Sequence, residues 1–124
     1  MKTKITVQDT MAAYRALKAL TVSVPVKYCD ARMFCDILDE FEKRCSIIES
    51  NLQKIIAKFG GNATGNGLIE FPDSGAKTEF EIEYNEFMMQ EDSIEYQEVN
   101  LSEYADYITL PIDAVKNLNR FIVF

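Results

Sequence analysis

Apolar residues in the first half of the chain recur at a helical spacing over a long stretch. They follow one another at alternating gaps of four and three residues and form the seam: Phe34, Leu38, Phe41, Cys45, Ile48, Leu52, Ile55 and Phe59. A repeat of about 3.5 residues keeps one helical face turned toward the same neighbour over about seven turns. The seam therefore predicts a long helix over 26–59. Gly60-Gly61 should end it, because glycine adopts the left-handed C-cap conformation at little cost.

Two shorter amphipathic segments are predicted as helices near the ends of the chain. The first covers 7–20, with Thr6 or Asp9 as its N-cap, since both side chains accept hydrogen bonds from the first helical turn. The second covers 111–118 and has Pro111 at its first position, where a missing N–H costs nothing. The β-branched residues that follow the first helix are expected to be extended.

Residues 77–91 fit two patterns. Phe80, Ile82 and Tyr84 alternate with glutamates, as they would in a strand. Phe80, Tyr84 and Phe87 also share one face of a helix. The length of the segment and its content of Glu, Met and Gln favour the helix.

The remaining segments predict a small sheet and a loop. Strands at 94–99 and 121–124 are expected to pair with each other. The segment 60–67 is rich in glycine and is predicted to be a flexible loop. It is not predicted to bind phosphate, because it follows a helix and lacks the lysine of a phosphate-binding loop. The fold class is therefore α+β and mostly helical: one long central helix packed by shorter helices, with a small antiparallel sheet at the C-terminal end. We expect residues 1–124 to form a single domain.

The sequence offers little catalytic chemistry. It contains no histidine, which excludes Ser-His-Asp and Cys-His arrangements and leaves no ordinary base that titrates near neutrality. Cys29, Cys35 and Cys45 form no Cys-x-x-Cys pair and are interpreted as reduced, mostly packed thiols. We therefore expect no catalytic residue, no cofactor and no metal site.

The first ten residues carry no long apolar run. Lysine, threonine, isoleucine and valine alternate over 1–10, a pattern of neither a secretory signal nor a membrane span. We expect a cytoplasmic protein without a membrane partner.

Charge is distributed unevenly between the two halves of the chain, whose net charge is −7. Residues 1–59 carry ten basic and seven acidic residues, a balance of +3. Residues 60–124 carry three basic and thirteen acidic residues, a balance of −10. An acidic surface of this kind repels phosphate backbones, so direct nucleic-acid binding through this half is disfavoured. A protein with a basic surface is the partner that this half favours.

Glutamates and tyrosines of the acidic half form the candidate interaction surface, because tyrosine supplies contact area and a hydroxyl while carboxylates supply charge. For any one tyrosine, the competing interpretation is that its ring packs in the core. For the glutamates, the competing interpretation is that they are solvated surface residues without a partner. The candidate residues are Glu79, Glu83, Glu86, Glu95, Tyr96, Glu98, Glu103, Tyr104, Asp106 and Tyr107.

Several short segments carry a family resemblance in their order along the chain. They are Ala16-Leu17 to Leu20, Pro25-Val26-Lys27, Ile55-Ile56-Ala57-Lys58-Phe59-Gly60, Phe80 to Glu91 and Leu118 to Ile122. In this order the chain resembles the small proteins encoded by phages and prophages of Gram-positive and gut bacteria, a family without an established activity. The resemblance implies a phage setting in the host cytoplasm and brings no catalytic residue with it.

Three functions follow as hypotheses. The first is a non-catalytic phage accessory protein that binds a host or phage protein stoichiometrically through its acidic half; inhibition of a host nucleic-acid-binding protein is one form of it. The second is a structural or assembly factor of the phage tail, in which the long helix pairs along the seam, including with a second copy of the chain. The third, a small enzyme, is the least favoured.

Overall fold

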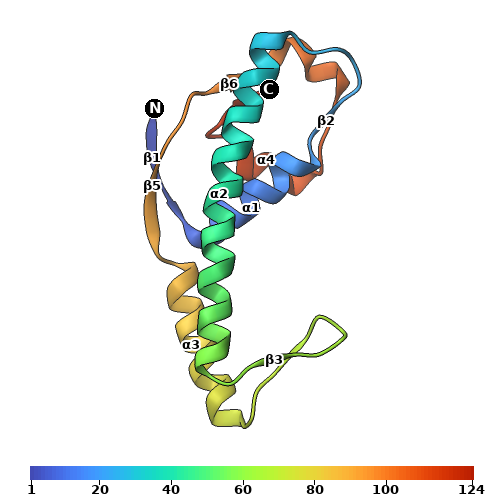
Figure 1. Cartoon of the computed structure of the whole chain (residues 1–124). Helices are drawn as coiled ribbons and strands as arrows, with labels where there is room; N and C mark the ends of the chain where they lie inside the picture. The colour runs from blue at the N-terminus through green and yellow to red at the C-terminus, as the bar shows by residue number, and fades with distance from the viewer.

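The computed structural model describes residues 1–124 and is built around one long helix (Figure 1). Helix α2 (Tyr28–Lys58) has 31 residues, about 46 Å at 1.5 Å per residue. The other helices are α1 (Val7–Ala19), α3 (Ser74–Met88), α4 (Ile112–Leu118) and the short 3-10 helix η1 (Ser102–Tyr107). The strands form four pairs: β1 (Lys2–Thr6) with β5 (Glu91–Glu95), β2 (Thr21–Val22) with β7 (Ile108–Thr109), β3 (Asn62–Ala63) with β4 (Ile69–Glu70), and β6 (Val99–Asn100) with β8 (Ile122–Val123). The fold is thus α+β and mostly helical, with a long helix packed by shorter ones, as the sequence predicts.

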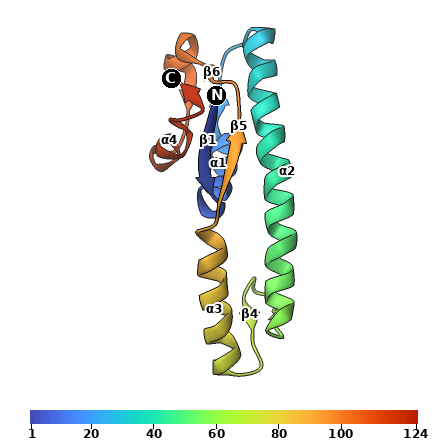
Figure 2. The ribbon, with the colours of Figure 1, turned by 90° about the vertical axis from the view of Figure 1, so that its left-hand side faces the viewer.

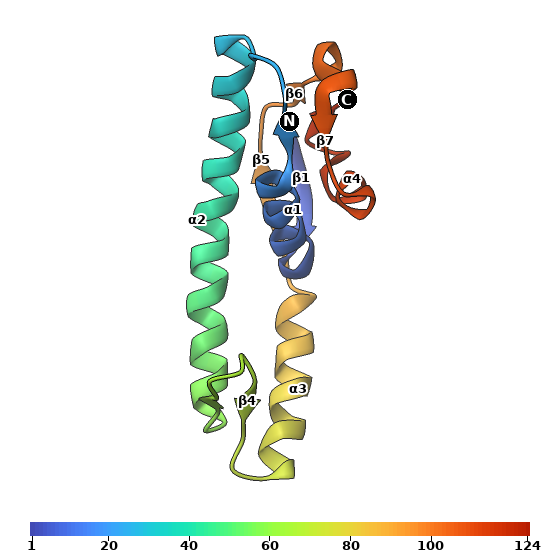
Figure 3. The ribbon, with the colours of Figure 1, turned by 90° about the vertical axis from the view of Figure 1, so that its right-hand side faces the viewer.

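The molecule is elongated and has two differently built halves (Figures 2 and 3). In the upper half, α1, α4 and the β1–β5 ribbon gather beside the first part of α2. In the lower half, only α3 runs antiparallel beside the second part of α2, and the β3–β4 hairpin lies at the end of this helix pair. The lower half is therefore two helices wide, while the upper half has a layered core.

The ends of the helices follow from local hydrogen bonding. The Thr6 side chain caps α1 by accepting from the Asp9 N–H at 3.1 Å, so of the two predicted caps Thr6 is the one used. The α2 helix stops where the sequence predicts, because Gly60 has a φ of 73° and the Gly61 N–H donates to the Ile56 carbonyl at 2.9 Å.

The segment predicted as a helix at 77–91 is a helix but is displaced toward the N-terminus. It runs from Ser74 because the Asp73 side chain caps it, accepting from the Ala76 N–H at 2.7 Å. It ends at Met88, which frees the following residues for β5. Helix α4 begins one residue later than expected, with Pro111 at the N-cap instead of the first helical position.

The main core lies in the upper half. Phe41 of α2 is fully buried and meets the edge of the Phe121 ring, with 5.1 Å between the ring centroids. The cluster draws residues from both ends of the chain: Ile5, Ala13, Ala16, Leu17, Ile37, Phe41, Ile94, Val99, Leu101, Tyr104, Ala114, Leu118, Phe121 and Ile122. Residues distant in sequence therefore fix the first part of α2.

The seam is covered within the chain itself. Phe41 and Ile48 are buried, and its six other members are half-buried. Helix α1 covers its first part and α3 its second (Figure 3). No seam residue is exposed, so the seam leaves no uncovered apolar row along α2.

The strand pairing differs from the prediction in two respects. The expected strand at 94–99 is instead β5 at Glu91–Glu95, and its antiparallel partner is the N-terminal β1, which the sequence did not predict. The C-terminal β8 pairs with β6 in a parallel ladder, with Val99 opposite Ile122. The segment 60–67, predicted to be a flexible loop, contains β3 and the turn of a short hairpin.

Candidate interaction groove between α2 and α3

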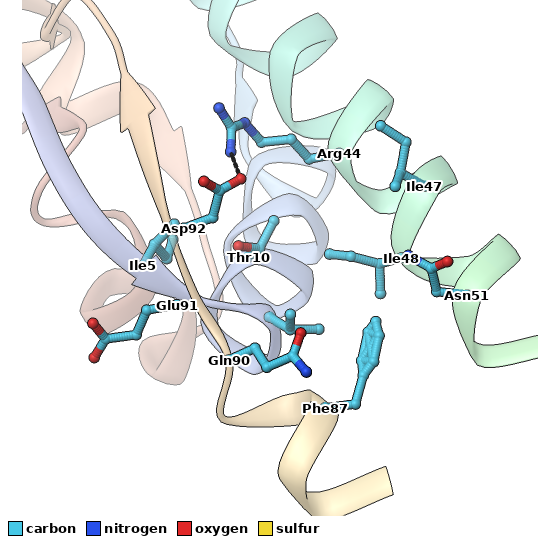
Figure 4. A pocket seen from close by; sticks show the side chains of 11 residues that line it. Ile5, Thr10, Arg44, Ile47, Ile48, Asn51, Phe87, Gln90, Glu91 and Asp92 are labelled. Carbon is cyan, nitrogen blue, oxygen red and sulfur yellow. Dashed lines mark hydrogen bonds and ion pairs between the residues drawn. The ribbon is translucent and has the colours of Figure 1, made fainter. Parts of the chain in front are cut away.

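Two neighbouring hollows lie along α2: the upper one between α2, the β1–β5 ribbon and the start of α1, and the lower one between α2 and α3. The upper hollow has a volume of about 280 Å³ and the lower one about 670 Å³. Phe87 and Gln90 border both hollows, so the two are neighbours. Figure 4 shows the upper hollow, with Ile48 and Asn51 on α2 facing Phe87 at the end of α3. We call the two hollows together the groove.

The α2 wall is a stripe of residues three and four positions apart, which places them on one helical face. It consists of Arg44, Ile47, Ile48, Asn51, Ile55, Lys58 and Phe59. Ile48 is buried against the neighbouring elements, whereas Ile47 is 64% exposed. This wall therefore offers an isoleucine that nothing in the chain covers.

The α3 wall has the same periodicity and is acidic. Glu79, Ile82, Glu83, Glu86, Phe87 and Gln90 line it at spacings of three and four. Ile82 is 57% exposed. The strand-like alternation of Phe80, Ile82 and Tyr84 explains its position: residues two apart lie on nearly opposite sides of a helix, so Ile82 points away from Phe80.

The opposite side of the helix pair is closed by the β3–β4 hairpin. A Cβ at Gly61 would lie 2.7 Å from Ile56 Cγ2 and 3.0 Å from Ile69 Cγ2, so the hairpin packs directly on α2. The Phe71 ring lies 4.7 Å from the Phe80 ring of α3, centroid to centroid. One side of the helix pair is therefore covered, and the groove side is open.

Negative charge exceeds positive charge along the groove. Four carboxylates and two cations face it, a balance of −2, and the Glu91 carboxylate points away from the upper hollow (Figure 4). Lys58 pairs with Glu83 across the helices at 2.9 Å. Arg44 is engaged with Glu40 and Asp92. No cation of the chain pairs with Glu79, Glu86 or Glu91.

Arg44 fixes the upper end of the groove. Its guanidinium reaches from α2 to β5, where Nη1 donates to Asp92 Oδ2 at 3.2 Å (Figure 4). Nη2 donates to the Ser93 carbonyl at 3.1 Å. On its own helix, Nε donates to Glu40 Oε1 at 3.0 Å. The bond to Ser93 also occupies a carbonyl on the outer edge of the two-stranded ribbon.

The structure separates the predicted interaction residues into two groups. Glu79, Glu83 and Glu86 lie together in the groove. The others lie in the upper half, on β5, the segment after it and η1 (Figure 1): Glu95, Tyr96, Glu98, Glu103, Tyr104, Asp106 and Tyr107. The ten residues therefore do not form one continuous surface.

Two of the predicted interaction tyrosines are structural. Tyr104 is only 6% exposed, and its hydroxyl donates to Asp30 Oδ2 at 3.0 Å while accepting from the Lys27 N–H at the start of α2. Tyr96 is half-buried and meets the Phe121 ring edge-on at 4.8 Å. Assigning Tyr104 to a docking surface was wrong, because its ring belongs to the core and its hydroxyl to the N-terminus of α2.

Sequence reasoning missed the apolar and amide residues of the groove. Ile47 lies next to the seam residue Ile48 and outside the seam, a position where an isoleucine is expected to be exposed. Ile82 lies off the face defined by Phe80 and Phe87. In both helices the available signal was an apolar residue out of phase with the buried face.

Among the thiols outside the groove, Cys29 and Cys35 are exposed on α2, so the prediction that the thiols are mostly packed was wrong for these two. Burial raises the pKa of the Cys45 thiol, which lies 3.9 Å from the Thr10 carbonyl. The hydrogen bond to Glu103 raises the pKa of the exposed Lys27 ammonium. No three Cys, Asp or Glu side chains lie close enough together to hold a metal ion. No helix combines the length and the apolar character that crossing a membrane requires.

Comparisons of the chain with protein-family models, curated proteins and solved structures give no match.

Proposed function

We propose that the protein acts by stoichiometric binding, with the acidic side of α3 docking on a basic surface of another protein. The supporting observation is the groove itself: Glu79 and Glu86 have no cationic partner and flank the exposed Ile82. Unpaired carboxylates beside an uncovered apolar side chain supply both steering and contact area. The same carboxylates disfavour a nucleic-acid ligand, because they would lie against its phosphates.

The phage setting is part of this proposal and rests on the resemblance of the sequence. In that setting the chain works in the host cytoplasm, and its target is a host or phage protein. A row of carboxylates is negatively charged, as a phosphate backbone is. The basic surface with which a protein binds nucleic acid is therefore a suitable target. Binding to such a site inhibits it by occupying it, without a catalytic step.

A tail assembly factor is the second candidate, and the long helix favours it. A rod of about 46 Å is suited to holding two components apart. Pairing of two long helices along the seam is not favoured, because the chain already covers the seam. An assembly role would therefore use the groove or the upper half as its contact surface.

Affinity capture at two salt concentrations tests the proposal. The whole protein is immobilised and exposed to bacterial lysate at about 0.05 M and about 0.5 M salt, since screening weakens contacts between exposed charges. We expect a basic protein to be retained at low salt and released at high salt. Retention should fall for Glu79→Lys/Glu86→Lys and persist for Glu81→Lys/Glu98→Lys, which changes charge by the same amount outside the groove.

Two outcomes count against binding to a basic partner. One is the absence of any salt-sensitive protein in the retained fraction. The other is equal loss of retention in both double variants, which would show that only net charge matters. Recovery of the protein from purified phage particles would favour the assembly role instead.

A further inference from the structure

We propose that the groove binds an amphipathic helix of another protein, with an apolar stripe flanked by lysine or arginine. This inference rests on the proposed function and specifies the form of the basic partner. It names a binding mode, a helix lying between α2 and α3, and the charge pattern which that helix must carry.

The shape of the groove favours a helix over an extended segment. Both walls of the lower hollow are helices, and the exposed Ile82 borders it, while the exposed Ile47 borders the upper hollow on α2. A third helix in such a furrow completes a three-helix bundle, and apolar anchors three and four residues apart match the spacing of both walls. At the upper hollow, Arg44 already occupies the outward-facing Ser93 carbonyl of β5, which an added strand would need as an acceptor.

The dimensions of the walls set the length of the ligand helix. From Arg44 to Lys58 the α2 wall rises about 21 Å, and from Glu79 to Phe87 the α3 wall rises about 12 Å, at 1.5 Å per residue. A helix of about 14 residues covers this distance. Its four turns provide room for two apolar anchors and a pair of cations on one side.

The charges set the sign and spacing of the ligand's polar residues. Glu79 and Glu86 are seven residues apart, so they lie on the same side of α3, about 10 Å from each other along the axis. Lysine or arginine side chains two turns apart on the ligand would meet Glu79 and Glu86 together.

The same charges argue against a second copy of this chain as the occupant. Two grooves facing each other would each bring a balance of −2, and the lining cations are already engaged with Glu83, Glu40 and Asp92. Like charges facing each other in an interface strongly disfavour association. A basic helix from another protein removes that repulsion.

A designed peptide tests the binding mode on the whole protein. The probe is a labelled peptide of about 18 leucine and lysine residues, with leucines at i, i+3, i+4 and i+7 so that it folds with one apolar stripe. The control peptide has the same composition in an order without a stripe. Binding is measured by fluorescence anisotropy at about 0.15 M salt, and circular dichroism verifies that each protein variant is folded.

Matched variants separate the groove from the overall charge. Glu79→Lys/Glu86→Lys should weaken binding of the striped peptide at least about tenfold, and Glu81→Lys/Glu98→Lys by no more than about threefold. Ile82→Gln should weaken it about fivefold, because it removes an apolar anchor. Ile112→Gln, at another exposed isoleucine, on α4, should leave it unchanged.

Three results would overturn the inference. They are equal affinity for the two peptides, equal weakening by the two double variants, and a protein dimer that Ile82→Gln dissociates. If the peptide fails while the lysate still yields a salt-sensitive partner that Glu79→Lys/Glu86→Lys releases, the helical mode is wrong and basic-partner binding stands. If neither binds, both proposals fail.

Discussion

Replacing Arg44 with methionine tests how the long helix is fixed to the β1–β5 ribbon. Methionine keeps an unbranched apolar stem of similar length and removes the guanidinium. The change deletes the bond to the Ser93 carbonyl, the pair with Asp92 and the pair with Glu40 on the same helix. These contacts join α2 to a strand nearly fifty residues away, so they should matter for folding and for the upper end of the groove.

The expected cost follows from the exposure of each contact. A hydrogen bond from a charged donor contributes about 1.5 to 3 kcal/mol, and the lower end applies because the Arg44 side chain is 22% exposed. The exposed pair with Asp92 adds about 0.5 kcal/mol or less, and the pair with Glu40 about 0.3 kcal/mol. We expect a loss of about 2 kcal/mol in the free energy of unfolding. For a chain of this size that lowers Tm by about 8 °C.

Urea unfolding followed by far-ultraviolet circular dichroism measures this loss. The midpoint should fall while the m-value stays constant, since the same surface is exposed on unfolding. Arg32→Met is the matched control, because Arg32 is an exposed arginine of α2 without an ion pair. A loss below about 0.5 kcal/mol for Arg44→Met, or an equal loss for both variants, would refute the role assigned to Arg44.

Three further changes test the packing. Phe41→Ala should lower the free energy of unfolding by about 3 to 5 kcal/mol in the same urea assay, because it opens a cavity at a fully buried ring; a loss below about 1 kcal/mol would contradict the core described. Gly61→Ala should lower the free energy of unfolding by about 1 to 3 kcal/mol, since the added Cβ would lie 2.7 Å from Ile56 Cγ2. Gly65→Ala is the control and should change this free energy little, because Gly65 lies in open space. Equal effects of the two changes would show that the hairpin does not pack on α2. At about pH 8, Cys45 should react with iodoacetamide about ten times more slowly than the exposed Cys29 and Cys35, because its raised pKa leaves less thiolate and its side chain is half-buried. Mass spectrometry gives the rates. Equal rates for the three cysteines in the folded protein would contradict the burial of Cys45.

The long helix was predictable because its signal is local and repeated. Eight seam positions keep one period over 26 residues, and the glycines after Phe59 mark the end. The start of α3 was misplaced because the segment has two possible beginnings, and the Asp73 cap decides between them. Helical propensity alone does not distinguish the two.

The ribbon was missed because its signal lies in two segments far apart in the chain. Lys2–Thr6 has only Ile5 as a buried residue, and Glu91–Glu95 has only Ile94, so neither shows a strong alternation. Their register explains the charges: Lys2 lies opposite Glu95 in the antiparallel pair. Such complementarity becomes visible only when the partner is known.

The sequence identified only some of the residues that line the groove. The glutamates of α3 were identified from their charge, and Glu79, Glu83 and Glu86 do lie together. The exposed isoleucines Ile47 and Ile82 were not identified, because for Ile82 exposure depends on which side of the helix pair the β3–β4 hairpin covers. Tyr104 was misassigned for the converse reason: its burial depends on Lys27 and Asp30, about 75 residues earlier.

Mapping the bound peptide on the isotopically labelled protein by NMR is the most direct test of the central claim, that the acidic side of α3 is the binding face. Titration with the striped leucine-lysine peptide should shift the methyl signals of Ile47 and Ile82 and the amide signals of residues 79–90 most strongly. Signals of η1, including Tyr107, should stay in place. Shifts concentrated in the upper half, or spread evenly over all exposed carboxylates, would contradict it.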